Sequence, residues 1–151
     1  MLELGAGCGL LSILAGRNGA SKVVATDLDT TQLEVNIKQN ISNTTEGHLT
    51  MVKCLSWGDA KQAKALDFQP DLIIGSEILY LFNLHDDLLV TLDALSSDST
   101  KVLMSFKKRN LGEEGFLDKA RARQWNVEFV KLSDLHRDFQ TGDYIVFWMT
   151  R

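Results

Sequence analysis

The sequence predicts an α/β domain with a doubly wound, mostly parallel sheet of seven strands and an antiparallel hairpin at its carboxyl end. Three observations predict this fold. Short apolar segments alternate with segments of helical spacing, an order that gives parallel strands with helices on both faces. The last two apolar segments have no full helix between them, which predicts an antiparallel pair. A glycine-rich turn follows the first strand, as it does in α/β sheets that bind a ligand at their strand ends.

The first elements of the chain are short. Met1–Leu4 reads as the end of a strand, and because only four residues precede the first glycine, we expect the numbering to begin inside a longer protein, with a truncated first strand. Gly9–Asn18 reads as a helix that the Asn18-Gly19 pair closes, since these residues accept the left-handed backbone that ends a helix. Lys22–Thr26 follows as a short, β-branched strand.

The second helix has two candidate capping residues. The side chain of Asp29 or Thr30 can accept a hydrogen bond from the first free N–H groups of a helix over Thr31–Asn40. The polar run Ser42–Gly47 is predicted to be a loop. A strand and a short helix complete this half of the chain: Leu49–Cys54 and Asp59–Leu66.

The second half contains the clearest apolar strand and the most regular helix. Asp71–Gly75 is an apolar run that follows the only proline, Pro70. Leu84–Leu95 places its leucines on one face at helical spacing. The remaining strand, helix and final two strands are, in order, Lys101–Phe106, Gly115–Gln124, Val127–Leu132 and Tyr144–Met149.

Size and composition indicate a single domain over residues 1–151. Sixteen basic against twenty acidic residues argue against a broad electropositive surface, so no nucleic-acid partner is expected. No apolar run is long enough to cross a bilayer, so we expect no membrane contact and a cytoplasmic protein, with a nuclear location also open. The two cysteines and three histidines lack the spacing of metal ligands, so no metal is expected. The oligomeric state is left open.

The turn after the first strand carries Gly5, Gly7 and Gly9. Glycine is needed where the backbone approaches a ligand closely or where a tight turn requires unusual dihedral angles. A dinucleotide-binding turn has the spacing G-x-G-x-x-G. Here Leu10 occupies the last of these positions and the third glycine comes one residue earlier, which favours a ligand without a pyrophosphate. The alternative is a plain tight turn from strand to helix.

Asp27 ends the second predicted strand. A carboxylate at that point can accept hydrogen bonds from both hydroxyls of a ribose, which an amide or a hydroxyl does less well. Two alternatives are open. Asp27 caps the following helix, a task for which Asp29 is better placed, or Asp29 binds the ribose in its stead.

Four segments together resemble one family. They are Leu2-Glu3-Leu4-Gly5-Ala6-Gly7-Cys8-Gly9-Leu10, Ala25-Thr26-Asp27-Leu28, Leu55-Ser56-Trp57-Gly58 and Asp71-Leu72-Ile73-Ile74-Gly75-Ser76-Glu77-Ile78-Leu79-Tyr80. The chain resembles the non-histone protein lysine methyltransferases of the seven-β-strand class, methyltransferase-like 21 type, which have a Rossmann-like fold. The glycine motif alone fits any class I methyltransferase, and the Trp-Gly pair and the acid-x-x-Tyr element make the match specific.

The resemblance implies a site for S-adenosyl-L-methionine at the strand ends. It implies that the glycine turn lines the methionine and ribose portion, that Asp27 binds the ribose and that Ser76 lies beside the cofactor. Trp57 would lie along the adenine, since an indole offers a large flat face; an ordinary half-buried core tryptophan is the alternative. The residues that match the family's cofactor-binding motifs are Glu3, Gly5, Ala6, Gly7, Gly9, Asp27, Trp57 and Ser76.

Glu77 and Tyr80 match the acid-x-x-Tyr motif, which implies catalytic roles. Methyl transfer from a sulfonium needs an amine lone pair in line with the S–CH₃ bond, so a lysine must be held neutral and aimed. A carboxylate can orient the amine, and an aromatic face can favour the partly cationic transition state. The alternatives are a capping or solvated acid for Glu77 and core packing for Tyr80.

The resemblance implies that the substrate is a lysine side chain of another protein, of the chaperone, ATPase or translation factor class. Family members usually carry a segment before the glycine strand, so a truncated, catalytically inactive binding module is one alternative, and a small-molecule methyltransferase is another. The absence of proline after Ser76 argues against a nucleic-acid amino-methyltransferase, and the glycine spacing argues against an NAD-dependent oxidoreductase. For the basic run Lys107-Lys108-Arg109, a solvated loop is favoured over contact with an acidic substrate.

Overall fold

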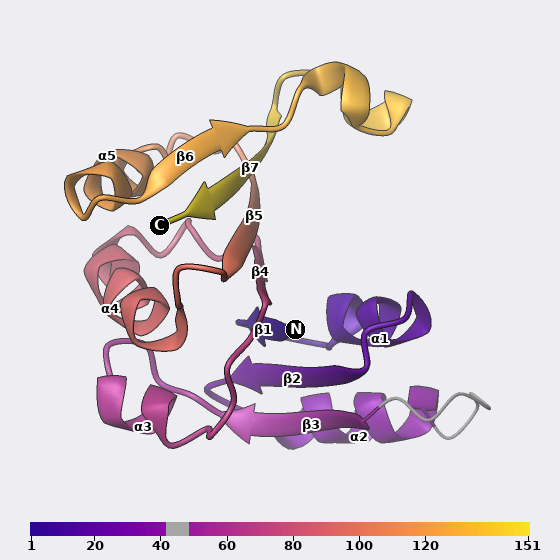
Figure 1. Ribbon diagram of the computed structural model, residues 1–151. Helices are drawn as coiled ribbons and strands as arrows, with labels where there is room; N and C mark the ends of the chain where they lie inside the picture. Colours follow the sequence, from indigo (N-terminus) through magenta and orange to yellow (C-terminus); the bar gives the residue numbers. More distant parts are fainter. Residues whose placement is uncertain (42–48) are drawn as a thin grey trace.

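The computed structural model describes residues 1–41 and 49–151, which form a sheet of seven strands in the order β3-β2-β1-β4-β5-β7-β6 (Figure 1). The first five strands run parallel to their neighbours among themselves, and β7 runs antiparallel to both β5 and β6. The predicted fold class is therefore confirmed. The strands are β1 Leu2–Leu4, β2 Lys22–Asp27, β3 Leu49–Cys54, β4 Leu72–Ser76, β5 Lys101–Lys107, β6 Asn126–Phe129 and β7 Tyr144–Thr150.

Helices lie on both faces of the sheet (Figure 1). The helices α1 and α2 pack beside β1, β2 and β3, and α3, α4 and α5 lie over the opposite face. The α-helices are α1 Leu10–Arg17, α2 Thr31–Ile41, α3 Ala60–Lys64, α4 His85–Leu95 and α5 Gly115–Ala122. Short 3-10 helices are η1 Phe82–Leu84, η2 Leu132–Asp134 and η3 Arg137–Phe139.

The main core lies between the sheet and the helices α4 and α5. Alternate residues of β5, Val102, Met104 and Phe106, are buried in it because successive side chains of a strand point to opposite faces. Leu88 and Leu92 of α4 lie four residues apart on one helix face and are fully buried against the same core. The apolar face that the sequence predicts for this helix is thus the face that packs on the sheet.

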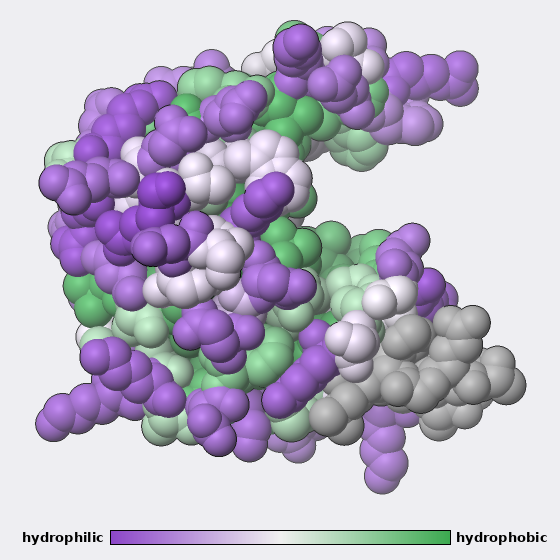
Figure 2. Space-filling view, in the orientation of Figure 1, coloured by the Kyte–Doolittle hydropathy of each residue, from purple (hydrophilic) through white to green (hydrophobic). Residues whose placement is uncertain are grey.

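The opposite face of the sheet is covered mainly at one end. Leu33 and Ile37 of α2 pack against Ala25 of β2. Leu72 of β4 and Leu103 of β5, on the same face, are only half-buried. Figure 2 shows the molecule hollowed here, with apolar surface between the part that holds β1 to β3 and the part that holds β6 and β7. The predicted layering on both faces therefore holds fully only for the first three strands.

Element boundaries differ from the predicted ones mainly near the carboxyl end. The strand β6 ends at Phe129, earlier than predicted, because a 3-10 helix begins at Leu132. The helix α4 begins at His85 after the unpredicted η1. The predicted loop Ser42–Gly47 lies outside the described residues. No helix within residues 1–41 and 49–151 is long and apolar enough to cross a membrane.

A buried acid connects the first strand to the first helix. Glu3 of β1 is 3% exposed, and its carboxylate accepts a hydrogen bond from the backbone N–H of Ser12 at 2.9 Å and another from the Ser12 hydroxyl. Burial raises the pKa of the Glu3 carboxyl, and the nearby charge of Asp27 adds to this rise, while the Ser12 hydrogen bonds oppose it. The position of α1 therefore depends on a carboxyl group that water does not reach.

Glu3→Gln is expected to flatten the pH dependence of stability. Because the pKa of Glu3 is raised in the folded protein above its ordinary 4.5, the stability that this carboxyl contributes is complete below that pH and declines as the pH rises through the folded-state value. The amide keeps an acceptor oxygen but cannot ionise. The free energy of unfolding of the wild type should therefore fall relative to the variant as the pH rises above about 4.5, as measured by urea denaturation.

The matched control is Glu128→Gln, which changes an exposed glutamate of β6. If the stability difference between the wild type and Glu3→Gln stayed constant with pH, it would contradict the inference that ionisation of the Glu3 carboxyl destabilises the folded protein.

Candidate functional site

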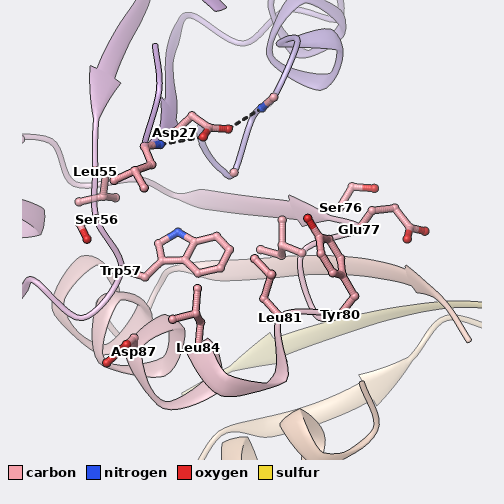
Figure 3. A pocket seen from close by; sticks show the side chains of 14 residues that line it. Asp27, Leu55, Ser56, Trp57, Ser76, Glu77, Tyr80, Leu81, Leu84 and Asp87 are labelled. Carbon is pink, nitrogen blue, oxygen red and sulfur yellow. Dashed lines mark hydrogen bonds between the residues drawn. The ribbon is translucent and has the colours of Figure 1, made fainter. Parts of the chain in front are cut away.

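A cavity of about 470 Å³ opens at the carboxyl ends of the parallel strands (Figure 3). The loops after β1, β2, β3 and β4 and the first turn of α4 form its walls. Parallel strands end at one edge of the sheet, so residues far apart in the sequence meet there. Seven of the ten predicted site residues line the cavity: Gly5, Gly7, Asp27, Trp57, Ser76, Glu77 and Tyr80.

Asp27 connects the first two loops of the cavity. One oxygen of its carboxylate accepts a hydrogen bond from the N–H of Gly7 at 2.7 Å, and the other accepts one from the N–H of Leu28 at 2.7 Å. The helix α2 is capped instead by Asp29, whose carboxylate accepts a hydrogen bond from the N–H of Thr31 at 3.0 Å. These bonds hold the pKa of Asp29 below its usual value. The capping interpretation therefore applies to Asp29, and Asp27 faces the cavity.

The glycines of the first turn have different tasks. Gly5 has a φ of +62°, and a Cβ there would lie 3.3 Å from the ring of Trp57. Gly7 has a φ of +52° and open space where a Cβ would lie. Gly9 has a φ of +80°, and its Cβ would lie only 2.7 Å from Leu33 of α2. Gly5 and Gly7 therefore shape the cavity, whereas Gly9 allows α1 and α2 to pack closely.

Three residues of the predicted cofactor set, Glu3, Ala6 and Gly9, do not line the cavity. Glu3 is bonded to Ser12 inside the protein, and Ala6 is buried in the cluster that contains Leu33. These residues belong to the matching motif, but the structure places them behind the glycine turn, where they support it.

Trp57 is half-buried and lies across the middle of the cavity (Figure 3). Its neighbour Gly58 fixes this position, because it has a φ of +87° and donates its N–H to the hydroxyl of Thr91 in α4 at 2.9 Å. A Cβ at Gly58 would lie 2.7 Å from the carboxylate of Asp87. The Trp-Gly pair is thus one unit: the glycine makes the turn and helix α4 anchors it.

Glu77 lies in a strained backbone conformation at the end of β4, with a φ of +57°. Its carboxylate accepts a hydrogen bond from the N–H of Lys107 at 2.9 Å and forms an ion pair with Arg109 at 2.5 Å. Lys107, Lys108 and Arg109 are all exposed, as the predicted solvated loop implies, and Arg109 in addition forms an ion pair with the predicted catalytic acid. Glu77 is neither a helix cap nor a freely solvated side chain.

Ser76 and Tyr80 lie on either side of this turn. The Ser76 hydroxyl accepts a hydrogen bond from the hydroxyl of Ser105 in β5 at 2.9 Å. Tyr80 is 45% exposed, so the core-packing alternative does not apply to it. Figure 3 shows its ring at the cavity wall, with the hydroxyl directed toward the end of β4. Both residues are therefore available to molecules that enter the cavity.

Sequence reasoning missed several residues that line the cavity, among them Leu55, Leu81, Leu84 and Asp87. Leu84 ends η1 just before α4, and Asp87 lies in the first turn of α4, three residues later. A helical reading of the segment after the acid-x-x-Tyr element could have found this pair. Arg109 carried no such signal, because its contact with Glu77 depends on the unusual backbone at that position.

Several solved structures that share this fold are methyltransferases. The chain superposes on a ribosomal protein L11 methylase from Lactobacillus delbrueckii subsp. bulgaricus with a TM-score of 0.72 and 19% identity, over 99% of this chain and 68% of that one. It also superposes on magnesium protoporphyrin IX methyltransferase (ChlM) from Synechocystis PCC 6803 with bound SAH, with a TM-score of 0.67 and 14% identity, over 99% and 73% of the two chains. The fold is that of a class I methyltransferase.

The chain belongs to the lysine methyltransferase family, whose family model matches residues 1–123. It is 39% identical over 124 residues to protein-lysine methyltransferase METTL21E of Bos taurus, covering 79% of this chain and 42% of that protein. It is 36% identical over 151 residues to protein N-lysine methyltransferase METTL21A of Danio rerio, covering 96% and 63%. To EEF1A lysine methyltransferase 3 of Xenopus tropicalis it is 32% identical over 111 residues, covering 72% and 47%. The chain spans about half the length of the first curated relatives that it matches.

Gly7→Ala and Gly9→Ala are expected to differ in stability although both glycines have a positive φ. The first variant suffers only the cost of a left-handed backbone, about 1–2 kcal/mol. The second adds the overpacking of Leu33, typically a further 1–3 kcal/mol. Thermal and urea denaturation of the two variants measure this difference. Equal losses of stability would show that α2 gives way freely and would contradict a packing role for Gly9.

Proposed function

We propose that this chain is the catalytic body of an S-adenosyl-L-methionine-dependent protein-lysine N-methyltransferase. The observation that supports this most directly is the convergence of Gly5, Asp27 and Trp57 on one cavity in a member of the lysine methyltransferase family. The relatives METTL21E, METTL21A and EEF1A lysine methyltransferase 3 are named for that activity. Glu77 and Tyr80 are the proposed catalytic residues, and Ser76 lies beside the reacting groups.

The cavity suits an adenosyl cofactor in its shape and in its polar groups. A volume of about 470 Å³ is that of a site for a small molecule. Each oxygen of the Asp27 carboxylate can accept two hydrogen bonds. The N–H of Gly7 uses one position on one oxygen and the N–H of Leu28 one on the other, so each oxygen retains a position for a ribose hydroxyl. Trp57 offers a flat ring to the adenine. At Gly7 the space where a Cβ would lie is open, so the backbone there can be approached by the methionine portion, whereas the missing Cβ at Gly5 lets Ile78 and Trp57 pack closely.

The chain's own residues would hold the acceptor lysine. When bound, S-adenosyl-L-methionine supplies an electrophilic methyl: the N–CH₃ bond forms as the S–CH₃ bond breaks, S-adenosyl-L-homocysteine is left and the extra proton of the amine passes to water. Glu77 retains acceptor positions for an amine N–H beside those used by Lys107 and Arg109. The positive charge of Arg109 disfavours a second cation nearby, so it helps to keep the lysine neutral. Tyr80 offers its aromatic face to the charge that develops on nitrogen.

The proposed partner is a protein substrate of the chaperone, ATPase or translation factor class. The name of EEF1A lysine methyltransferase 3 supports the last of these. The proposed compartment is the cytoplasm, which the two free and exposed thiols Cys8 and Cys54 favour, because exposed thiols persist where the medium is reducing.

Calorimetry with S-adenosyl-L-homocysteine is expected to show binding that depends on Asp27. Asp27→Ala should weaken the affinity about tenfold or more, because hydrogen bonds to a charged acceptor contribute about 1.5–3 kcal/mol. Asp29→Ala, which removes a carboxylate two residues away that caps α2, is the matched control and should keep the affinity. Heat with NADH and none with S-adenosyl-L-homocysteine would overturn the cofactor assignment.

Incubation with tritiated S-adenosyl-L-methionine and a cell lysate is expected to label protein in the form of methyl-lysine. Glu77→Gln should lower this label about tenfold or more, because it removes the charge that orients the amine. Glu34→Gln on the exposed face of α2 is the control and should leave the label unchanged. Label in RNA with none in protein would defeat the assignment. Cofactor binding without any label would assign the chain to the binding modules.

A further inference from the structure

A second cavity, of about 310 Å³, adjoins the proposed catalytic acid. The end of β5, the start of β7 and the turn between η2 and η3 form its walls. Ser76 and Glu77 at the end of β4 line both this cavity and the first one. The side chains that give the second cavity its character are Phe106, Leu135, Phe139, Tyr144 and Val146.

The two cavities lie on opposite sides of β4. In the sheet, β4 has β1 as one neighbour and β5 as the other. The first cavity is built from the loops after β1, β2, β3 and β4 and the start of α4, and the second from β5, β7 and residues 135–139, so that only Ser76 and Glu77 belong to both. The turn at Ser76 and Glu77 therefore separates a space on the cofactor side from a space on the β5 side. Methyl transfer needs donor and acceptor on opposite sides of the moving carbon.

The carboxylate of Glu77 is held on the β5 side. Both groups that bind it, the N–H of Lys107 and the guanidinium of Arg109, belong to the end of β5 and the residues that follow it. In Figure 3 the carboxylate points away from Trp57 and out of the first cavity. An amine that is to be oriented by Glu77 therefore meets it most directly from the β5 side.

The lining of the second cavity suits a lysine side chain, which has an apolar stem and a cationic or amine end. The rings of Phe139 and Tyr144 meet edge to face with centroids 5.1 Å apart. The ammonium of Lys107, a lysine of this chain, already lies 5.5 Å from the centroid of the Tyr144 ring. Aromatic walls with a carboxylate at the inner end thus offer contacts to both parts of a lysine.

We propose that this second cavity receives the side chain of the substrate lysine, which enters between β5, β7 and residues 135–139 and presents its amine to Glu77 from the side opposite the cofactor. The inference rests on the proposed function. The rival route passes Leu81 and Leu84, which line the first cavity and not the second. The two routes place the lysine against different residues, so they can be told apart by where a lysine analogue binds.

The test is an NMR titration of the isotope-labelled chain with Nα-acetyl-lysine N-methylamide, with and without S-adenosyl-L-homocysteine. The expected result is a set of shifts in the backbone signals of Ser105, Ile145 and Val146. The uncharged analogue Nα-acetyl-norleucine N-methylamide should give weaker shifts at the same positions, because it has the apolar stem without the amine.

Two variants of the second cavity are compared, so that a folding defect in either one does not decide the test. Val146→Phe should fill the cavity and abolish the shifts, and Phe139→Ala should weaken them by removing one ring of the wall. The matched control is Phe129→Ala, because Phe129 is 49% exposed against 47% for Phe139 but lines neither cavity. The affinity for S-adenosyl-L-homocysteine, measured in parallel, should be the same in all three variants.

Shifts at Leu81 and Leu84 with none at Val146, or no shifts from the lysine analogue at all, would overturn the proposal. Leu81→Ala examines the rival route, because Leu81 lines only the first cavity, and should leave the titration unchanged. Failure to bind S-adenosyl-L-homocysteine would instead defeat the proposed function, and the titration without that compound would still locate the lysine analogue.

Discussion

The hydrogen bonds of the Asp27 carboxylate are the interaction on which the rest of the site depends. The parallel register of β1 and β2, with Leu4 beside Thr26, brings the first two loops together. The carboxylate then accepts the N–H groups of Gly7 and Leu28 and fixes one loop against the other. A hydrogen bond from the N–H of Ala6 to the carbonyl oxygen of Thr26 at 2.9 Å joins the same two segments through the backbone. The same carboxylate is the proposed ribose ligand, so the loop is preorganised by the group that binds.

The order of elements along the chain and half of the cavity lining could be predicted from the sequence because both follow from local patterns. Asp27 ends β2, Trp57 lies in the loop after β3 and Glu77 directly follows β4, and the carboxyl ends of these parallel strands meet at one edge. A motif match does not reveal which way a residue faces. Glu3 and Ala6 match the motif as well as Gly5 does, yet both are buried: Glu3 belongs to β1, which is buried on both faces, and Ala6 packs in the cluster that contains Leu33.

What could not be predicted depends on contacts between distant segments. Arg109 reaches Glu77 only because the backbone at Glu77 turns through a positive φ and directs the carboxylate toward β5. The second cavity forms only because the turn between η2 and η3 lies over the start of β7. Aromatic residues such as those in its walls are common in edge strands, so their presence in the sequence did not indicate a cavity. Such features have no period or spacing in the sequence, and geometry alone reveals them.

The close approach of Gly9 to α2 has a consequence for how the family can vary. A side chain at position 9 would collide with Leu33 and Ile37, both of which are buried under the sheet. A larger residue at position 9 therefore requires a smaller residue at position 33 or 37 in the same protein. An alignment of relatives should show these three positions changing together, and the glycine third in the motif would then record the spacing of two helices rather than the chemistry of a cofactor.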